Sequence, residues 1–304
     1  MIRSDNSHLG QQVHPRLARM VGVQARVLSR NPLVWLNLVC LDAPLVAISW
    51  QWIFGNTLHL VVPLGHRLAL FFTGWLIYLA DRFGDSMSLR SSQPKSLRQQ
   101  FCLRYGNVWL GAIIGVGMID AIVVLEAVDY ATLVPGAIVG GVTIAYIVIN
   151  YARNEVWETI PLKELAIGSL FAAGTLLGVT PHIFAVQTTT ISAAILFATL
   201  CWLNCVSIAI WERNLDRAQG RHSMATGWRD VNLLMRAVFP IFLIGCALLV
   251  VLDCLLLPMA LCLAMSGLLL GALYFAPVSR DQRTAFADLV LLTPLLLLVV
   301  RSWL

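Results

Sequence analysis

The stretch that decides the fold is residues 71–85, FFTGWLIYLADRFGD, in which an apolar run ends in the carboxylates of Asp81 and Asp85. A second stretch, SIAIWERNLD at 207–216, ends in the same way with Glu212 and Asp216. Residues at positions i and i+4 lie one above the other on one helix face. Each pair therefore stacks two like charges, which is unfavourable unless a cation lies between them. In a chain with only 16 acidic residues, two such pairs predict a divalent-metal site.

The rest of the sequence is strongly apolar. Hydrophobic residues make up 59% of the chain and charged residues 12%, whereas a soluble domain carries roughly 25% charged residues. Apolar segments near the ~20 residues needed to cross a bilayer recur throughout. The sequence therefore predicts an all-α, polytopic membrane bundle with about nine transmembrane helices. The predicted spans are about 33–54, 63–81, 106–126, 132–151, 164–182, 188–211, 231–252, 255–277 and 286–303. Only Asp253 and Cys254 separate the seventh span from the eighth, so eight or ten spans remain open.

The basic residues predict which side of the membrane the acidic pairs face. All but two of the 21 Lys and Arg residues, Arg67 and Arg301, fall in the N-terminal tail or in or near alternate loops. Two of these predicted loops are long and basic, 86–105 after the first acidic pair and 217–230 after the second. Because Lys and Arg are retained on the cytoplasmic side, the N-terminus and both acidic pairs are predicted to be cytoplasmic, in a plasma membrane such as a bacterial inner membrane. The net charge of +5 follows from this topology. It gives no reason to expect a nucleic-acid partner.

Two parts of the chain are distinguished by composition. Residues 1–31 form a basic tail that lacks the apolar core of a signal peptide. Within it, arginines recur at helical spacing over 16–30, which predicts an amphipathic helix on the anionic membrane surface. A disordered basic tail is the alternative. Residues 32–304 form the predicted transmembrane bundle.

A third polar segment lies between the two acidic pairs. It contains Tyr151 and Arg153, and Lys163 follows at the start of the fifth predicted span. Two carboxylate pairs on separate helices can hold Mg²⁺, which prefers oxygen ligands and keeps several waters that a phosphate can displace. A diphosphate leaving group needs cations nearby, because negative charge builds on its oxygens as the C–O bond breaks. Arg153 and Lys163 are candidates for that role.

In this order, the motifs resemble those of the UbiA superfamily of intramembrane prenyltransferases. The resemblance rests on Tyr78–Asp85, on Lys163–Gly174 and on Asn204–Gly220, and it extends over about residues 32–304. It implies helices around a central cavity that is open to membrane lipid. It also implies transfer of a prenyl group, with Mg²⁺ assistance, from a prenyl diphosphate to a small lipophilic or aromatic acceptor.

The resemblance implies roles for individual residues. Prenyl diphosphate would be bound through Mg²⁺ by the two acidic pairs, which are Asp81, Asp85, Glu212 and Asp216. Lys163 would contact the diphosphate directly, and Tyr151 would lie near the reacting centre.

The chain also departs from the family pattern. The first motif of the family usually begins Asn-Asp, where this chain has Ile77 and Tyr78. The second motif usually has Asp at the position of Glu212. The alternative function is therefore a catalytically diverged lipid-binding protein or a membrane transporter.

A structural interpretation of the acids leads to a different geometry. As simple helix-end charges they would point outwards, towards Arg82, Arg213 or Arg217. As a metal site they would converge on one cavity, with Lys163 or Arg153 at its rim. The alternative for Lys163, Arg153 and Arg221 is that each only determines the membrane topology.

Asp42 is a separate candidate, because it lies near the middle of the first predicted span. An ionisable group at that depth is costly and normally faces a cavity or a partner. Pro44 loosens the helix nearby. Asp42 either faces the cavity and binds a polar acceptor, which we prefer, or is a protonated carboxyl bonded to a neighbouring helix. Asp120, in the third span, is a weaker case of the same kind.

Overall fold

The protein is described by a computed structural model that covers residues 32–159, 162–179 and 188–301. The predicted basic tail and its amphipathic helix lie outside these ranges. The described part of the chain contains helices and connecting turns and no β-strand. The predicted all-α class is thus confirmed for the described residues.

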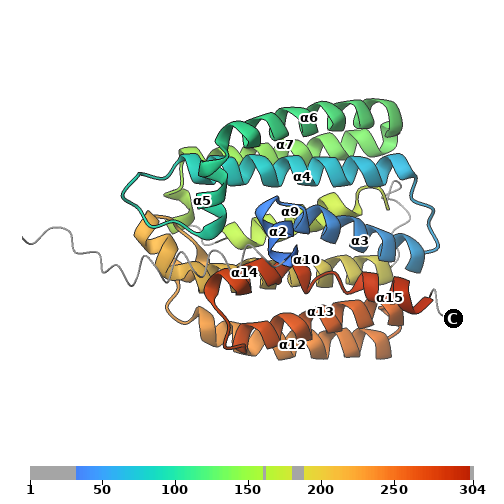
Figure 1. The fold of residues 1–304 in the computed structure, drawn as a ribbon. Helices are drawn as coiled ribbons and strands as arrows, with labels where there is room; N and C mark the ends of the chain where they lie inside the picture. The colour runs from blue at the N-terminus through green and yellow to red at the C-terminus, as the bar shows by residue number, and fades with distance from the viewer. Residues whose placement is uncertain (1–31, 160–161, 180–187, 302–304) are drawn as a thin grey trace, which may run out of the picture.

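Fourteen helices follow one another in the described part of the chain. In the labels of Figure 1 they are α2 (Pro32–Leu38), α3 (Asp42–Thr57), α4 (Leu64–Met87), α5 (Leu97–Arg104), α6 (Gly106–Ala127), α7 (Tyr130–Ala152), α8 (Val156–Thr159), α9 (Lys163–Leu176), α10 (Thr188–Gln219), α11 (Met224–Gly227), α12 (Val231–Val251), α13 (Leu257–Phe275), α14 (Arg280–Leu289) and α15 (Pro294–Arg301).

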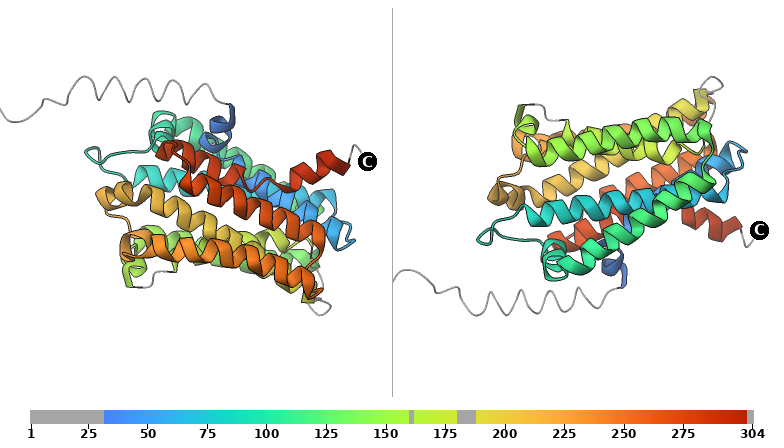
Figure 2. Two further views of the ribbon diagram at one scale, coloured as in Figure 1. Left: turned by 90° about the horizontal axis from the view of Figure 1, so that it is seen from below. Right: turned by 90° about the horizontal axis from the view of Figure 1, so that it is seen from above.

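The long helices lie side by side, with α6 and α7 on one face of the bundle and α12 and α13 on the opposite face (Figures 1 and 2). Between these faces, α4 packs against α3 and α6, and α10 packs against α9, α12 and α13. Helices α4 and α10 both end on the left in Figure 1. We call this the acidic end of the bundle, because both acidic pairs lie there.

Five helices, α6, α7, α10, α12 and α13, are long and apolar enough to cross a membrane. Only 17% of the apolar window of α6 and 6% of that of α7 is buried by protein. Since a helix that is apolar on all sides needs an apolar surrounding, these helices indicate a membrane-embedded protein. Nine spans are not confirmed. For example, α3 has 16 residues and α9 has 14, fewer than the ~20 that a straight crossing requires.

The first and the ninth predicted spans are each interrupted. The first divides into α2 and α3 around Cys40, whose φ of 58° is in the left-handed region and cannot continue a helix. The ninth divides into α14 and α15 between Leu289 and Pro294, and proline has no N–H with which to continue a helix. Both spans were predicted as continuous helices, and the structure corrects this.

Two indole groups satisfy backbone carbonyls at these breaks. Trp75 Nε1 donates to the Val39 carbonyl at 2.9 Å, beside the break between α2 and α3. Trp50 Nε1 donates to the Leu291 carbonyl at 2.8 Å, within the break between α14 and α15. An unpaired carbonyl in an apolar surrounding costs several kcal/mol, on the order of a lost hydrogen bond. These two hydrogen bonds therefore remove that cost at one carbonyl of each break.

The main hydrophobic core joins α3, α9, α10, α12 and α13. At its centre, Trp50 stacks on Phe197 with ring centroids 4.5 Å apart. Helices α9 and α10 approach closely at Gly168, where a Cβ would lie 2.7 Å from the backbone nitrogen of Trp202. This close packing brings the start of α9, at Lys163, beside the end of α10.

The predicted basic loops are partly helical. Helix α4 continues to Met87, and the segment predicted as a loop over 86–105 contains α5. Helix α5 is capped by a capping box: the Ser96 side chain accepts from the Gln99 backbone, and the Gln99 side chain accepts from the Ser96 backbone. Helix α10 likewise continues to Gln219, and α11 follows within the second predicted loop, 217–230. Both acidic pairs therefore lie within regular helix, because α4 and α10 continue beyond them.

Candidate functional site

A cavity of about 280 Å³ lies between α4, α7, α9 and α10 at the acidic end. This volume is near the lower limit of the ~300–1,000 Å³ typical of small-molecule sites. On each helix the lining is polar near the acidic end and mostly apolar further in. From the acidic end inwards, the lining includes Asp85, Asp81, Ile77 and Gly74 on α4, Asn150, Ile147 and Thr143 on α7, Lys163, Ile167 and Phe171 on α9, and Asp216, Glu212, Ile208 and Cys205 on α10.

All four predicted acids line this one cavity. Asp81 and Asp85 reach it from α4, and Glu212 and Asp216 reach it from α10. The structure therefore brings the two acidic pairs together from helices that are distant in the sequence. Convergence on one cavity is the part of the metal-site prediction that this lining matches, whereas shared ligation of a metal ion stays a prediction. The alternative interpretation, in which the acids are simple helix-end charges, predicts carboxylates that point outwards and away from one another.

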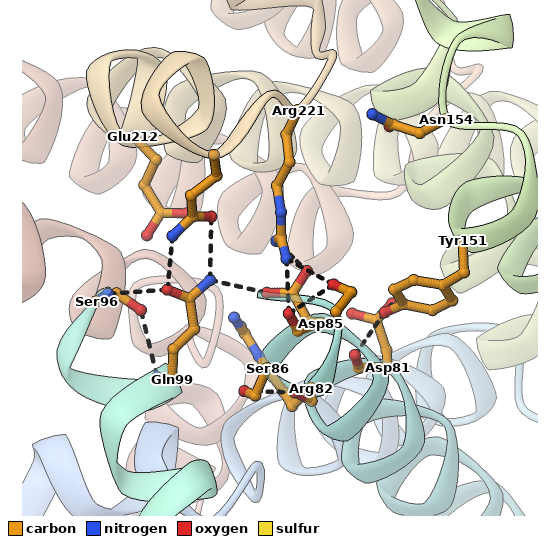
Figure 3. A network of polar contacts seen from close by, with 12 residues as sticks. Asp81, Arg82, Asp85, Ser86, Ser96, Gln99, Tyr151, Asn154, Glu212 and Arg221 are labelled. Carbon is orange, nitrogen blue, oxygen red and sulfur yellow. Dashed lines mark hydrogen bonds and ion pairs between the residues drawn. The ribbon is translucent and has the colours of Figure 1, made fainter. Parts of the chain in front are cut away.

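Asp85 is held by a cation and an amide. Arg221, which follows α10, forms an ion pair with the Asp85 carboxylate and also donates to the Asp85 backbone carbonyl at 2.7 Å (Figure 3). Gln99 Nε2 donates to Asp85 Oδ2 at 3.1 Å (Figure 3). Gln99 also exchanges hydrogen bonds with Gln219. The segments that follow the two acidic pairs are thus joined to each other and to Asp85.

Glu212 is paired with Arg98 of α5. Arg98 Nη2 donates to Glu212 Oε2 at 2.5 Å, and the two side chains are only 13% and 9% exposed. The Coulomb interaction of a buried pair is strong, but each ion has lost most of its hydration. Arg98 and Arg221 thus each neutralise one member of an acidic pair.

Asp81 is bonded to Tyr151 of α7. The Tyr151 hydroxyl is 2.9 Å from Asp81 Oδ1 and 2.5 Å from the Asp81 backbone carbonyl (Figure 3). Gly84 allows this approach, because a Cβ at that position would lie 3.0 Å from Tyr151 Cζ. Tyr151 does not line the cavity itself. It positions one of the carboxylates that do.

Asp216, Lys163 and Arg82 are the least engaged charges in the cavity. Within the described ranges, none of these three side chains forms a hydrogen bond or an ion pair. Lys163 is nevertheless within electrostatic range of both Asp81 and Asp216. Arg82, also in the lining, is within range of Asp81, Asp85 and Glu212. These groups are the ones most available to a ligand.

Two other predicted site residues lie outside the cavity lining. Arg153 is an exposed residue just after α7. Asp42 is 1% exposed at the first residue of α3, where its carboxylate accepts from Asn37 Nδ2 at 2.6 Å and from the Ala43 backbone at 3.0 Å. Of the two alternatives for Asp42, the structure favours a carboxyl bonded to neighbouring protein groups. Asp120 is similarly bonded, to the Thr73 hydroxyl at 2.9 Å.

The sequence reasoning did not identify three residues of the site. Arg98 and Arg221 stand in the basic segments after the acidic pairs and were interpreted as topology signals. Glu164 lines the cavity, accepts from the Met224 backbone through Oε1 at 3.0 Å, and keeps Oε2 buried with no partner among the described residues. The sequence feature that could have identified Glu164 is its position next to Lys163, in the first turn of a helix.

Among residues 32–159, 162–179 and 188–301, no three His, Cys, Asp or Glu side chains are arranged to hold a metal ion. The absence of such a group agrees with the ion pairs of Asp85 and Glu212, because each of these carboxylates already faces an arginine. Comparisons with protein-family models, with curated proteins and with solved structures found no match. The site is therefore interpreted from its own geometry.

Proposed function

We propose that this protein is an integral-membrane prenyltransferase that transfers a prenyl group from a prenyl diphosphate to a small lipophilic or aromatic acceptor, with Mg²⁺ assistance. The observation that supports this most is a cavity whose charged end carries both acidic pairs and whose inner part is mostly apolar. Such a lining suits an amphiphile with an anionic head and a hydrocarbon chain. The motif order of the UbiA superfamily supports the same function.

The available carboxylates fit Mg²⁺ in kind and in number. Mg²⁺ is usually held by one or two carboxylates, together with substrate phosphates and water, and does not need a cage of protein ligands. Of the four predicted acids, Asp216 and Asp81 are the two that are not paired with an arginine among the described residues. They would hold the ion, which when bound would neutralise charge on the diphosphate.

The protein's own cations and walls would assist the reaction. As the C–O bond of the donor breaks, the diphosphate leaves with the electron pair, and Lys163 and Arg82 face the growing negative charge. The apolar lining beyond them, including Ile147 and Ile208, excludes water that would otherwise capture the prenyl cation. Tyr78 presents an aromatic ring to the same space, which stabilises a cation through its π-face.

The proposed location follows from the charges. Most basic residues lie in segments at the acidic end or in the N-terminal tail. We therefore place the acidic end on the cytoplasmic side of a plasma membrane, where a soluble or membrane-bound diphosphate can enter the cavity.

The test is donor consumption by the purified protein. The protein in detergent is incubated with a panel of prenyl diphosphates and aromatic or lipophilic acceptors, with Mg²⁺ or with a chelator. Consumption should require Mg²⁺ and should be lost in Asp81→Asn and Asp216→Asn. The matched control is Asp230→Asn, an exposed acid outside the cavity. Absence of both turnover and Mg²⁺-dependent binding across the panel would rule the proposal out.

Membrane transport is a second candidate, favoured by the two broken helices. Transporters commonly place their sites where helices are interrupted. Here the break between α2 and α3 and the break between α14 and α15 belong to helices that pack on one another. Flux of a prenyl diphosphate across sealed vesicles that contain the protein, without its chemical conversion, would favour transport over transfer.

A further inference from the structure

The cavity has a second polar wall, formed by α7 and α9, which pack against each other. Apart from Lys163, the groups of the proposed metal and diphosphate site come from α4 and α10. The wall of α7 and α9 contributes Tyr146, Asn150 and Glu164 to the lining. These three polar side chains have no role in the metal site, so their ligand has to be found separately.

Glu164 is a buried acid on this wall with one free oxygen. Only 4% of the residue is exposed, although it lines the cavity. Its Oε1 accepts from the Met224 backbone N–H at 3.0 Å, which fixes the carboxyl group in place. Its Oε2 is buried and has no hydrogen-bond partner among the described residues, and none of the ion pairs found there includes Glu164.

The position of Glu164 in its helix favours the ionised form. It is the second residue of α9 and the acidic residue of the first turn. The helix dipole stabilises a negative charge at that end. A carboxylate has no O–H group and can only accept hydrogen bonds. The partner that Oε2 lacks is therefore a donor.

Asn150 is a second unpaired acceptor in the same lining. Its Oδ1, near the end of α7, is buried and has no hydrogen-bond partner in the part of the chain that the structure describes. Tyr146 lies one turn earlier on the same face of α7. The Tyr146 ring packs against Trp157 with centroids 5.5 Å apart, which holds it in place. This wall thus offers two hydrogen-bond acceptors and an aromatic ring.

The burial of the two acceptor atoms favours a ligand that brings donors. Buried acceptors in folded proteins almost always have a partner, because an unpaired one keeps the full cost of its desolvation. In Glu164 and Asn150 that cost is already present in the ligand-free protein. A ligand with an O–H or N–H group recovers it without further desolvation of the protein.

We propose that Glu164 and Asn150 bind the polar head of the prenyl acceptor, and that this head is a hydroxyl or an amine and not a carboxylate. A hydroxyl or an amine can donate to either oxygen, whereas a carboxylate has no donor and carries the same charge as Glu164. An aromatic acceptor would place its ring against Tyr146. The identification of this ligand as the acceptor rests on the proposed function, whereas the preference of the subsite for donors does not.

Equilibrium dialysis with matched aromatic probes tests the preference. Two probes, para-butylphenol and para-butylaniline, carry a donor. The methyl ether para-butylanisole has none, and para-butylbenzoate is a carboxylate. Each is bound to the full chain in lipid nanodiscs without Mg²⁺ or diphosphate, and empty nanodiscs correct for partition into lipid.

At neutral pH the wild type should bind the better of the two donor probes at least about tenfold more tightly than the ether or the benzoate, the usual effect of a hydrogen bond to a charged group. The tighter donor probe identifies the head as a hydroxyl or an amine. Equal affinity for the donor probes and the ether overturns the subsite. So does a wild type that binds neither donor probe.

Glu164→Gln should shift two probes in opposite directions. The amide keeps an acceptor for the Met224 N–H but loses the charge. The donor probes should bind several-fold more weakly, and the benzoate should bind more tightly because the repulsion between like charges is gone. Glu155→Gln, at an exposed acid outside the cavity, should change neither affinity. A purely structural role of Glu164 would move both affinities in the same direction, and that result overturns the proposal.

Asn150→Leu is the second variant, because it removes an acceptor and leaves the Met224 contact of Glu164 intact. It should weaken binding of the donor probes and leave the benzoate unchanged, since no charge is removed. Binding of the donor probes that survives both substitutions overturns the subsite.

The outcome can be separated from that of the proposed function. If the preference is found but no prenyl diphosphate is consumed, the subsite is supported and the transferase is not. Prenyl transfer without the preference would support the transferase and overturn the subsite.

Discussion

Arg98 on α5 donates to Glu212 on α10 across 2.5 Å, although the two residues are 114 positions apart in the chain. The contact ties the segment after the first acidic pair to the second acidic pair. Together with the pairing of Arg221 and Asp85, it closes the acidic end of the bundle around the cavity. Each acidic pair is thus stabilised by an arginine from the segment that follows the other pair.

The Arg98–Glu212 pair gives a prediction for stability. Arg98→Met leaves the Glu212 carboxylate buried without its cation and should destabilise the protein by about 3–5 kcal/mol, the usual cost of breaking a buried pair. The double variant Arg98→Met with Glu212→Gln removes the uncompensated charge and should recover part of that loss. Thermal unfolding in detergent measures both. A double variant no more stable than Arg98→Met would show that the pair is not coupled.

Lys163 and Arg153 give a matched comparison of two cations. Lys163 lines the cavity, whereas Arg153 is exposed and outside it. If Lys163 faces the leaving diphosphate, Lys163→Gln should lower kcat of prenyl transfer by about 10²–10³, as loss of one electrostatic group does. Arg153→Gln should leave kcat unchanged. Steady-state kinetics with a fixed acceptor decides, and equal effects of the two substitutions would remove Lys163 from the proposed site.

Two glycines of α9 provide a packing test within one helix. A Cβ on Gly168 would lie 2.7 Å from the Trp202 backbone nitrogen, whereas a Cβ on Gly174 would meet nothing within 4 Å. Gly168→Ala should therefore force α9 away from α10 and cost about 1–3 kcal/mol. Gly174→Ala should instead stabilise the helix, by up to about 1 kcal/mol. Unfolding midpoints in detergent measure both changes. A neutral Gly168→Ala would contradict the close contact between the two helices.

The helix cap at Asp129, between α6 and α7, should make the stability of the folded protein depend on pH. The pKa of its carboxyl is lowered because the carboxylate accepts from the Thr132 backbone N–H at the start of α7, and His66 contributes. A lowered pKa means that the capping contribution is present above the ordinary Asp pKa of about 3.9 and is lost as the pH falls below it. Asp129→Ala should cost about 1 kcal/mol at neutral pH.

The control for this prediction is Asp129→Asn, since asparagine also caps helices but does not titrate. Unfolding measured between pH 3 and pH 7 should show, relative to wild type, a smaller loss of stability at the acidic end for Asp129→Asn. The cap would be assigned wrongly if Asp129→Ala and wild type lost stability in parallel over the whole range.

The features that could be predicted from the sequence are those set by local patterns. Apolar runs predicted membrane helices, and helical spacing placed Asp81 with Asp85 and Glu212 with Asp216 on single faces. The turn at Asp253 and Cys254 does separate α12 from α13. The helix breaks were not predictable in this way. Cys40 has no intrinsic preference for a left-handed conformation, and it adopts one where Trp75 can bond the neighbouring carbonyl.

The sequence alone determined the helical class, the apolar surface and the position of the four acids at helix ends, because hydropathy and i, i+4 spacing act within one segment. Only the tertiary structure decided which groups these acids face. Asp85 meets Arg221, Glu212 meets Arg98, and Asp288 meets Asn204. Such pairings depend on how helices that are distant in the sequence pack together. A charge in an apolar surrounding then takes whichever partner that packing brings within reach, because leaving it unpaired costs more than any local preference.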